Sequence, residues 1–201
     1  MSALLERLKR IFDEGHGVEL PGLRTDAAFA PPGEVRPAAV MVGVTDRPEP
    51  GVILIHRPLD MRQHPGQVAF PGGKLDPGED AVGAALRETH EELGIDPSHI
   101  AIIGATDRFI TGTGYDITPV MGLMPPDLPI MPNPSEVSDW FEAPLRYVLD
   151  PRNRVRKQAE FRGMTREYTE IVWEGHVIWG VTAAIVENLS NRLAWEALID
   201  G

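Results

Sequence analysis

One segment of the chain, from Val82 to Leu93, has the spacing of an amphipathic helix between start and stop signals. Its apolar and small side chains recur at intervals of three and four, which is the pattern of one buried helix face. The members of this stripe are Val82, Ala85, Leu86, Thr89 and Leu93. Asp76-Pro77 or Asp80 can cap the start, and Gly94 is a natural stop. Mixed strands between such helices predict an α/β fold.

The flank of this stripe carries three glutamates, Glu88, Glu91 and Glu92, about one helical turn apart. Like charges at i and i+4 cost a helix roughly 0.2–0.5 kcal/mol, and negative charge is unfavourable near a helix C-terminus. Clustered glutamates usually form a solvated face, but here only Arg87 is available within the helix as a partner. Hard divalent cations prefer oxygen ligands, so the cluster predicts a metal site.

The helix and the loop before it resemble the Nudix box of the Nudix hydrolases. The matching positions are Gly73, Glu79, Arg87, Glu88, Glu91, Glu92, Gly94 and Ile95. Thr89 stands where the pattern usually has an aliphatic residue, and its hydroxyl can bond back to the helix. The resemblance implies an α/β/α sandwich with a mixed β-sheet between helices. It also implies a Mg²⁺- or Mn²⁺-dependent hydrolase for a nucleoside diphosphate linked to another moiety.

The same resemblance implies roles for individual residues. Metal is expected at Glu88, Glu91 and Glu92, and catalysis is assigned to Glu91, Glu92 and Glu136. Glu136 is either the general base or an extra metal ligand, with an ordinary loop glutamate as the equal alternative. A structural salt bridge between Glu79 and Arg87 is expected to tie the loop to the helix.

A run of residues just upstream, 53–73, narrows the expected substrate. It resembles the signature of the coenzyme A pyrophosphatase branch at Arg57, Arg62, Gly66, Phe70, Pro71, Gly72 and Gly73, and it departs from that signature at Ile55 and Pro58. Isolated arginines after a strand are ordinary solvated charges, but a guanidinium also forks onto phosphate oxygens. The residues expected to bind substrate are Arg57, Arg62, His64 and Lys74.

This second resemblance implies hydrolysis of coenzyme A or acyl-CoA to 3′,5′-ADP and 4′-phosphopantetheine or its acyl form. Coenzyme A carries an extra 3′-phosphate, for which further basic candidates are Arg152, Arg154, Arg156 and Lys157, in a segment expected to be a solvated loop. Two alternatives stay open. One is the same chemistry on ADP-ribose, NADH or a dinucleoside polyphosphate, and the other is a non-catalytic domain that binds a nucleotide.

Composition limits the remaining function classes. The net charge of −11 argues against nucleic acid as a partner, and the lack of cysteine excludes disulfides and zinc–thiolate sites. Neither an apolar stretch of about 18 residues nor a signal peptide is found, so a cytoplasmic protein without membrane contact is expected, as a monomer or homodimer. We expect a helix and extended arm over 1–37 and the hydrolase domain over 38–201.

The other elements follow from apolar runs between turn signals. Strands are expected at 38–44, 52–55, 67–70, 100–109 and 116–123, followed by a strand after Glu136, a helix at 145–149, a hairpin over 168–178 and a closing helix at 179–198. Trp173, Trp179 and Trp195 are expected in the core, because buried packing is the commoner use of tryptophan, although one of them could stack on adenine.

Overall fold

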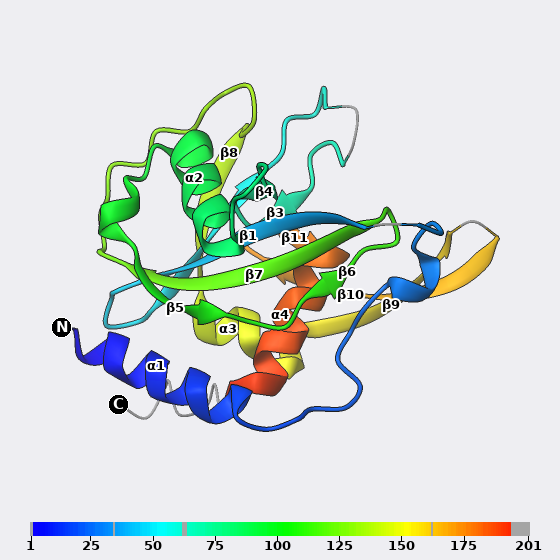
Figure 1. Ribbon diagram of the computed structural model, residues 1–201, viewed down its shortest axis with the longest axis horizontal. Helices are drawn as coiled ribbons and strands as arrows, with labels where there is room; N and C mark the ends of the chain where they lie inside the picture. Colours follow the sequence, from blue (N-terminus) through cyan, green and yellow to red (C-terminus); the bar gives the residue numbers. More distant parts are fainter. Residues whose placement is uncertain (1, 34, 62–63, 162, 194–201) are drawn as a thin grey trace.

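A mixed β-sheet between helices forms the body of the computed structural model, which describes residues 2–33, 35–61, 64–161 and 163–193 (Figure 1). Its strands are β1 (Arg36–Thr45), β2 (Gly51–His56), β3 (Val68–Ala69), β4 (Gly72–Lys74), β5 (Ala101–Ala105), β6 (Phe109–Ile110), β7 (Tyr115–Met124) and β8 (Asp139–Pro144). Strands β1 and β7 pair in parallel along their whole length, and the other pairs are antiparallel. The main path runs β3-β2-β1-β7-β5, with β4 beside β1, β6 beside β7 and β8 beside β2.

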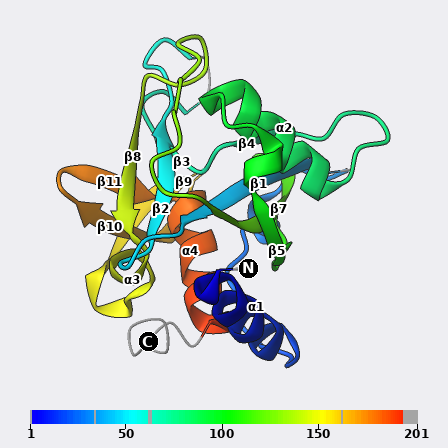
Figure 2. The ribbon, with the colours of Figure 1, turned by 90° about the vertical axis from the view of Figure 1, so that its left-hand side faces the viewer.

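Helices cover both faces of this sheet, so the α/β/α architecture expected from the sequence is confirmed (Figures 1 and 2). The helices are α1 (Ala3–His16), α2 (Ala81–Leu93), α3 (Leu145–Leu149) and α4 (Val181–Arg192). Side chains alternate along β1: Ala39 and Met41 pack towards α2, whereas Val42 and Val44 pack towards the other three helices. The sheet therefore has two apolar cores, one on each face.

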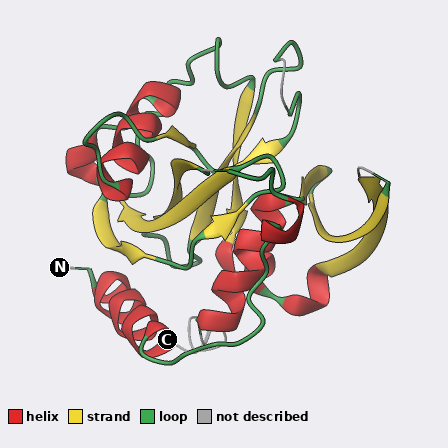
Figure 3. Ribbon diagram, turned by 45° about the vertical axis from the view of Figure 1, so that its right-hand side comes forward, coloured by secondary structure: helices red, strands yellow, loops and turns green. Residues whose placement is uncertain are grey.

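A second, three-stranded sheet extends from the side of the molecule that carries α4. It consists of β9 (Arg154–Phe161), β10 (Met164–Trp173) and β11 (His176–Trp179), all antiparallel, and β9 and β10 project as a long curved hairpin (Figure 3). Ile171 and Ile178 anchor this sheet in the core beside α4. His176 stacks on Phe141 of β8 at 3.8 Å between ring centroids, which joins the second sheet to the first.

The structure corrects the sequence-based prediction at both ends of this second sheet. Residues 154–161 form a strand rather than a solvated loop, because the backbone pairs with β10 and the charged side chains find acidic partners. Trp179 ends β11 instead of starting a helix, since Gly180 has a φ of +64° and α4 begins only at Val181. The predicted helical residues 194–198, Trp195 among them, lie outside the described residues.

Elsewhere the differences are smaller. The expected strand at 100–109 is divided into β5 and β6, and β5 has a register shift between Ile102 and Gly104 where it pairs with β7. The expected strand at 67–70 shortens to β3, and β4 follows it. Helix α1 contributes Leu4, Leu5, Leu8, Ile11 and Phe12 to the same core as α4. Among the described residues, no helix has the length and apolarity needed to cross a membrane.

Candidate functional site

The rotation of α2 about its axis decides which glutamates face the interior. Asp80 caps the helix by accepting a hydrogen bond from the Gly83 N–H at 2.7 Å, and Gly94 ends it in the left-handed region with a φ of +69°. Ala84 and Ala85 are fully buried against the sheet. The Thr89 hydroxyl, also buried, donates to the Ala85 carbonyl at 2.7 Å. This packing turns one side of the acidic cluster inward.

Three carboxylates come together beside this helix. Ligand oxygens of Glu88, Glu92 and Glu136 all lie within 4.8 Å of one another. Glu136 comes from the loop before β8, and backbone hydrogen bonds hold that loop against the end of α2. The Asn133 N–H donates to the Glu92 carbonyl at 2.9 Å, and the Glu136 N–H donates to the Asn133 carbonyl at 3.0 Å. Residues far apart in the sequence therefore build this acid triplet.

Burial raises the pKa of two members of the acid triplet, Glu92 and Glu88. Glu92 is only 4% exposed, and the loss of hydration raises its pKa to about 8, although the Gly72 N–H donates to its Oε2 at 2.9 Å. Burial also raises the pKa of Glu88, against the opposing effect of Arg87. Oxygen ligands that are costly to ionise together suit a divalent cation, because a bound cation offsets their mutual repulsion. The residues present therefore fit a metal site.

Arg87 ties the loop before α2 to the helix. Its Nε and Nη2 donate to the two carboxylate oxygens of Glu79, each at 3.0 Å, and Nη2 also donates to the Lys74 carbonyl. Its Nη1 donates to Glu88 at 2.9 Å and to Glu91 at 3.0 Å. The hydrogen bonds from Arg87 lower the pKa of Glu79. This arginine therefore connects the loop to the outer edge of the acidic cluster.

Glu91 lies at the outer edge of the acidic cluster, apart from the acid triplet. Its side chain is 49% exposed and turns to Arg87, and it is not a member of the acid triplet. The expected set of Glu88, Glu91 and Glu92 is thus not the set that lies closest together, because Glu136 takes the third place. Of the residues assigned to catalysis, Glu92 and Glu136 line the adjoining cavity, whereas Glu91 does not.

A cavity of about 640 Å³ opens beside the acid triplet. Three of the expected substrate-binding residues, Arg57, His64 and Lys74, line it, and the fourth, Arg62, lies outside the described residues. Arg57 is close enough to Glu92 for its charge to lower the pKa of that carboxyl. The Arg57 Nε is buried and has no hydrogen-bond partner within the described part of the chain. A phosphate oxygen is the kind of partner that such a group takes.

The other basic candidates do not face this cavity. Arg156 binds the buried Glu187 of α4, Lys157 binds Glu170 at 2.6 Å, Arg152 binds Asp150, and Arg154 donates to the Leu149 carbonyl. None of the four is among the residues that line the cavity. All four therefore make contacts within the protein, Arg152 just before β9 and the other three on it.

Several cavity residues were not anticipated from the sequence. Asp26 of the arm, Arg166 of β10, and the segment from Trp179 to Thr182 all contribute to the wall. No spacing or motif marks them, because they reach the cavity only through contacts between distant segments. The one feature of the sequence that pointed to such a residue was the possibility that a tryptophan stacks on adenine. The expectation that Trp179 lies in the core was wrong, since it is 40% exposed.

The raised pKa of Glu92 predicts how pH affects the metal-free protein. The unfolded carboxyl loses its proton near its ordinary pKa of 4.5, whereas the folded one keeps it up to about 8. The folded state therefore binds more protons in this interval, and its stability falls as pH rises from about 4.5 to about 8. Urea unfolding with a chelator, repeated across this range, measures the effect.

Glu92→Gln isolates the contribution of this carboxyl from that of the other acids. Its free energy of unfolding should fall less steeply than that of the wild type over the same pH range. Identical pH dependence in the two proteins would show that Glu92 titrates normally in the metal-free fold.

Comparisons with known proteins show which proteins this chain is similar to. The model of the NUDIX domain matches residues 34–168. A protein of Escherichia coli K12 named "Uncharacterized Nudix hydrolase NudL" is 40% identical over 159 residues, which cover 79% of this chain and 83% of that protein, and its counterpart in Escherichia fergusonii is equally similar.

Two solved structures share the fold at lower sequence identity. A Nudix hydrolase from M. smegmatis, RenU, aligns with a TM-score of 0.50 and 23% identity, covering 63% of this chain and 81% of that one. A MutT/nudix family protein from Enterococcus faecalis aligns with a TM-score of 0.50 and 16% identity, covering 97% of this chain and 74% of that one.

Proposed function

This chain belongs to the Nudix hydrolase family, and on that premise we propose that it hydrolyses the diphosphate bond of coenzyme A or of an acyl-CoA. Enzymes of this family hydrolyse diphosphate bonds with the help of divalent cations. The proposed products are 3′,5′-ADP and 4′-phosphopantetheine, or the acylated form of the latter.

The observation that carries this proposal is the position of the run from Arg57 to Gly73. This run resembles the coenzyme A pyrophosphatase signature, and many of its residues line the cavity directly beside the acid triplet. Those that do so are Arg57, Met61, His64, Gln67, Val68, Ala69, Phe70, Gly72 and Gly73. Substrate recognition and hydrolysis would therefore take place in one continuous space. Its volume falls within the range of about 300–1,000 Å³ that is common for small-molecule sites.

The acid triplet is the proposed holder of Mg²⁺ or Mn²⁺, with Glu91 as the neighbouring carboxylate, linked to Glu88 through Arg87. When bound there, such ions would neutralise the diphosphate, polarise the attacking water and stabilise the leaving phosphate. Mg²⁺ typically combines a few carboxylates with water and substrate phosphates, which agrees with a site at the edge of an open cavity.

The remaining steps fall to side chains of the chain itself. In this proposal Arg57 binds non-bridging phosphate oxygens, because it lines the cavity close to Glu92. Glu136 is the proposed acceptor of a proton from the attacking water, since it belongs to the acid triplet and lines the cavity. Hydrolysis then forms one new phosphorus–oxygen bond, breaks the bridging one and leaves a phosphate on each half.

Product analysis tests this function. We expect the purified protein with Mg²⁺ or Mn²⁺ to convert coenzyme A into 3′,5′-ADP and 4′-phosphopantetheine, and a chelator to stop the reaction. Chromatography with mass spectrometry identifies both halves. ADP-ribose, NADH and a dinucleoside polyphosphate are assayed in parallel under the same conditions.

Two results would contradict the proposal. Faster cleavage of one of the other substrates would assign the site to that nucleoside diphosphate. Tight nucleotide binding without turnover of any substrate would instead indicate a binding domain.

A further inference from the structure

Three polar and aromatic residues from elements other than those of the acid triplet also line the cavity: Asp26, Arg166 and Trp179. In Figure 1, the blue arm segment next to Asp26 lies at the right of the molecule, whereas α2 lies at the left. Asp26 precedes the family-matched residues 34–168, and Trp179 follows them. Two of these three residues therefore lie in parts of the chain outside the matched range.

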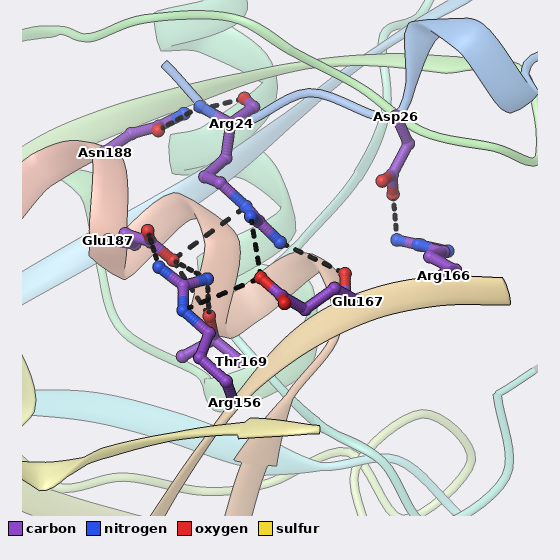
Figure 4. Close-up of polar contacts among 8 residues, drawn as sticks. All are labelled: Arg24, Asp26, Arg156, Arg166, Glu167, Thr169, Glu187 and Asn188. Atoms are coloured by element: carbon purple, nitrogen blue, oxygen red, sulfur yellow. Dashed lines mark hydrogen bonds and ion pairs between the residues drawn. The ribbon is translucent and has the colours of Figure 1, made fainter. Parts of the chain in front are cut away.

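The arm that carries Asp26 is held in place by specific contacts (Figure 4). The side-chain amide of Asn188, which is buried in α4, accepts a hydrogen bond from the Arg24 N–H at 2.7 Å and donates one to the Arg24 carbonyl at 3.0 Å. The Arg24 side chain donates to the Glu167 carbonyl of β10 at 3.1 Å. Two residues later, the Asp26 N–H donates to the Ile110 carbonyl at 2.8 Å. Asp26 is thus positioned by its own backbone hydrogen bond and by those of Arg24.

Asp26 and Arg166 form an ion pair in the cavity wall (Figure 4). Asp26 is buried, and the loss of hydration raises its pKa in spite of the attraction of Arg166 and Arg24. A carboxylate has several acceptor sites and a guanidinium has five N–H donors, so both groups can bind a ligand while they contact each other. The pair therefore offers an acceptor beside a donor, with little net charge.

Trp179 adds a flat apolar surface to the wall of the cavity. Its ring packs against that of Tyr168 of β10 at 5.8 Å between centroids and an interplanar angle of 61°. Tyr168 therefore supports the indole from one side, while 40% of Trp179 remains accessible. Exposed, supported aromatic rings are the surfaces on which flat heterocycles stack.

We propose that Asp26, Arg166 and Trp179 form a subsite for a purine base, with the ring stacked on Trp179 and its edge hydrogen-bonded by the ion pair. The subsite rests on the proposed function, in which the base is the adenine of coenzyme A. Adenine presents an amine donor beside a ring-nitrogen acceptor, which complements Asp26 and Arg166. A flexible pantetheine chain has no flat surface to stack and loses more conformational entropy when it is held.

Binding measurements on the two halves of the substrate test this subsite. Isothermal titration of 3′,5′-ADP and of 4′-phosphopantetheine is performed with the wild type, Trp179→Ala and Trp179→Phe. We expect Trp179→Ala to weaken the binding of 3′,5′-ADP about tenfold, because base stacking is lost. Trp179→Phe should retain most of the affinity, and the binding of 4′-phosphopantetheine should not change.

Val177→Ala is the matched control. Val177 lies two residues before Trp179 on β11, is 39% exposed and does not line the cavity, so its removal should leave both affinities unchanged. Thermal unfolding verifies that each variant is folded. Trp179→Phe keeps an aromatic ring at this position, so the proposal remains testable if the alanine variant does not fold.

Asp26→Asn tests recognition of the base edge. The wild type should bind adenosine 5′-monophosphate more tightly than inosine 5′-monophosphate, which has an oxygen acceptor in place of the adenine amine. The asparagine variant should reduce this preference roughly fivefold, about the value of one hydrogen bond.

The outcomes separate this subsite from the proposed substrate. Unchanged 3′,5′-ADP binding by Trp179→Ala, or a loss confined to 4′-phosphopantetheine, would overturn the base subsite even if coenzyme A is hydrolysed. If the wild type does not hydrolyse coenzyme A but Trp179→Ala weakens adenine-nucleotide binding, the subsite is supported and the proposed substrate is wrong.

Discussion

Replacing Glu92 with glutamine is expected to lower kcat about 10²–10³-fold, the usual effect of removing one group that stabilises charge in a transition state. Glu92 is the most buried member of the acid triplet, and its Oε2 is oriented by the Gly72 N–H at 2.9 Å. Glutamine keeps the shape and can still accept that hydrogen bond, but it carries no charge for a cation. Steady-state kinetics with Mg²⁺ and calorimetric titration of Mn²⁺ measure the two effects.

The fold of this variant should remain intact. Burial already favours the neutral form of the Glu92 carboxyl, whose pKa is raised to about 8, so the metal-free glutamine variant should be at least as stable as the wild type near neutral pH. Glu14→Gln, at an exposed position near the end of α1, is the charge-matched control and should change neither kcat nor Mn²⁺ affinity. Wild-type turnover by Glu92→Gln would rule out the assigned metal site.

Two neighbouring glycines should respond differently to substitution by alanine, one by losing activity and the other by losing stability. A Cβ added at Gly73 would lie 2.7 Å from Oε2 of Glu88, which is the end of a flexible side chain. Gly73→Ala should therefore fold but displace this carboxylate from the acid triplet, with a loss in kcat of about 10²-fold, because small misplacements of a catalytic group are costly. Kinetics and Mn²⁺ titration measure this loss.

The same change at Gly72 meets backbone instead of side chain. Its added Cβ would lie 2.6 Å from the Cα of Val40, so β1 and β4 would have to move apart. We expect Gly72→Ala to lower the free energy of unfolding by about 1–3 kcal/mol, measured by urea unfolding. If Gly73→Ala were the more destabilised variant, or if it kept full activity, the close approach of Gly73 to Glu88 would not matter for function.

The local part of the site was predictable because it is encoded in one helix. The stripe from Val82 to Leu93 and the two caps determine where α2 begins, ends and faces the sheet. The structure agrees on Asp80 and Gly94 as the caps. What the stripe could not distinguish was Glu91 from Glu92, which are adjacent in sequence. Their separation depends on packing: Glu92 is buried beside the start of β4 at Gly72, whereas Glu91 reaches Arg87 at the surface.

The distant parts of the site were not predictable from local patterns. Glu136 joins the acid triplet because its loop is hydrogen-bonded to the end of α2. Strand β9 was missed because its run of charged side chains is typical of a solvated loop, whereas Arg156 is neutralised by Glu187, which lies buried in α4. A strand with many charged side chains can be recognised only when the acidic and basic partners of those side chains are known.

The order in which the walls of the cavity occur along the chain has a consequence for synthesis. All three residues of the acid triplet have been synthesised once Glu136 has been added to the chain. The residues synthesised later include Arg166, Trp179 and Asn188 of α4, which binds the backbone of Arg24. The arm, although it precedes the acid triplet in the sequence, has no Asn188 to bind until then. A nascent chain therefore contains all three carboxylates of the acid triplet before the residues that complete the cavity wall have been synthesised.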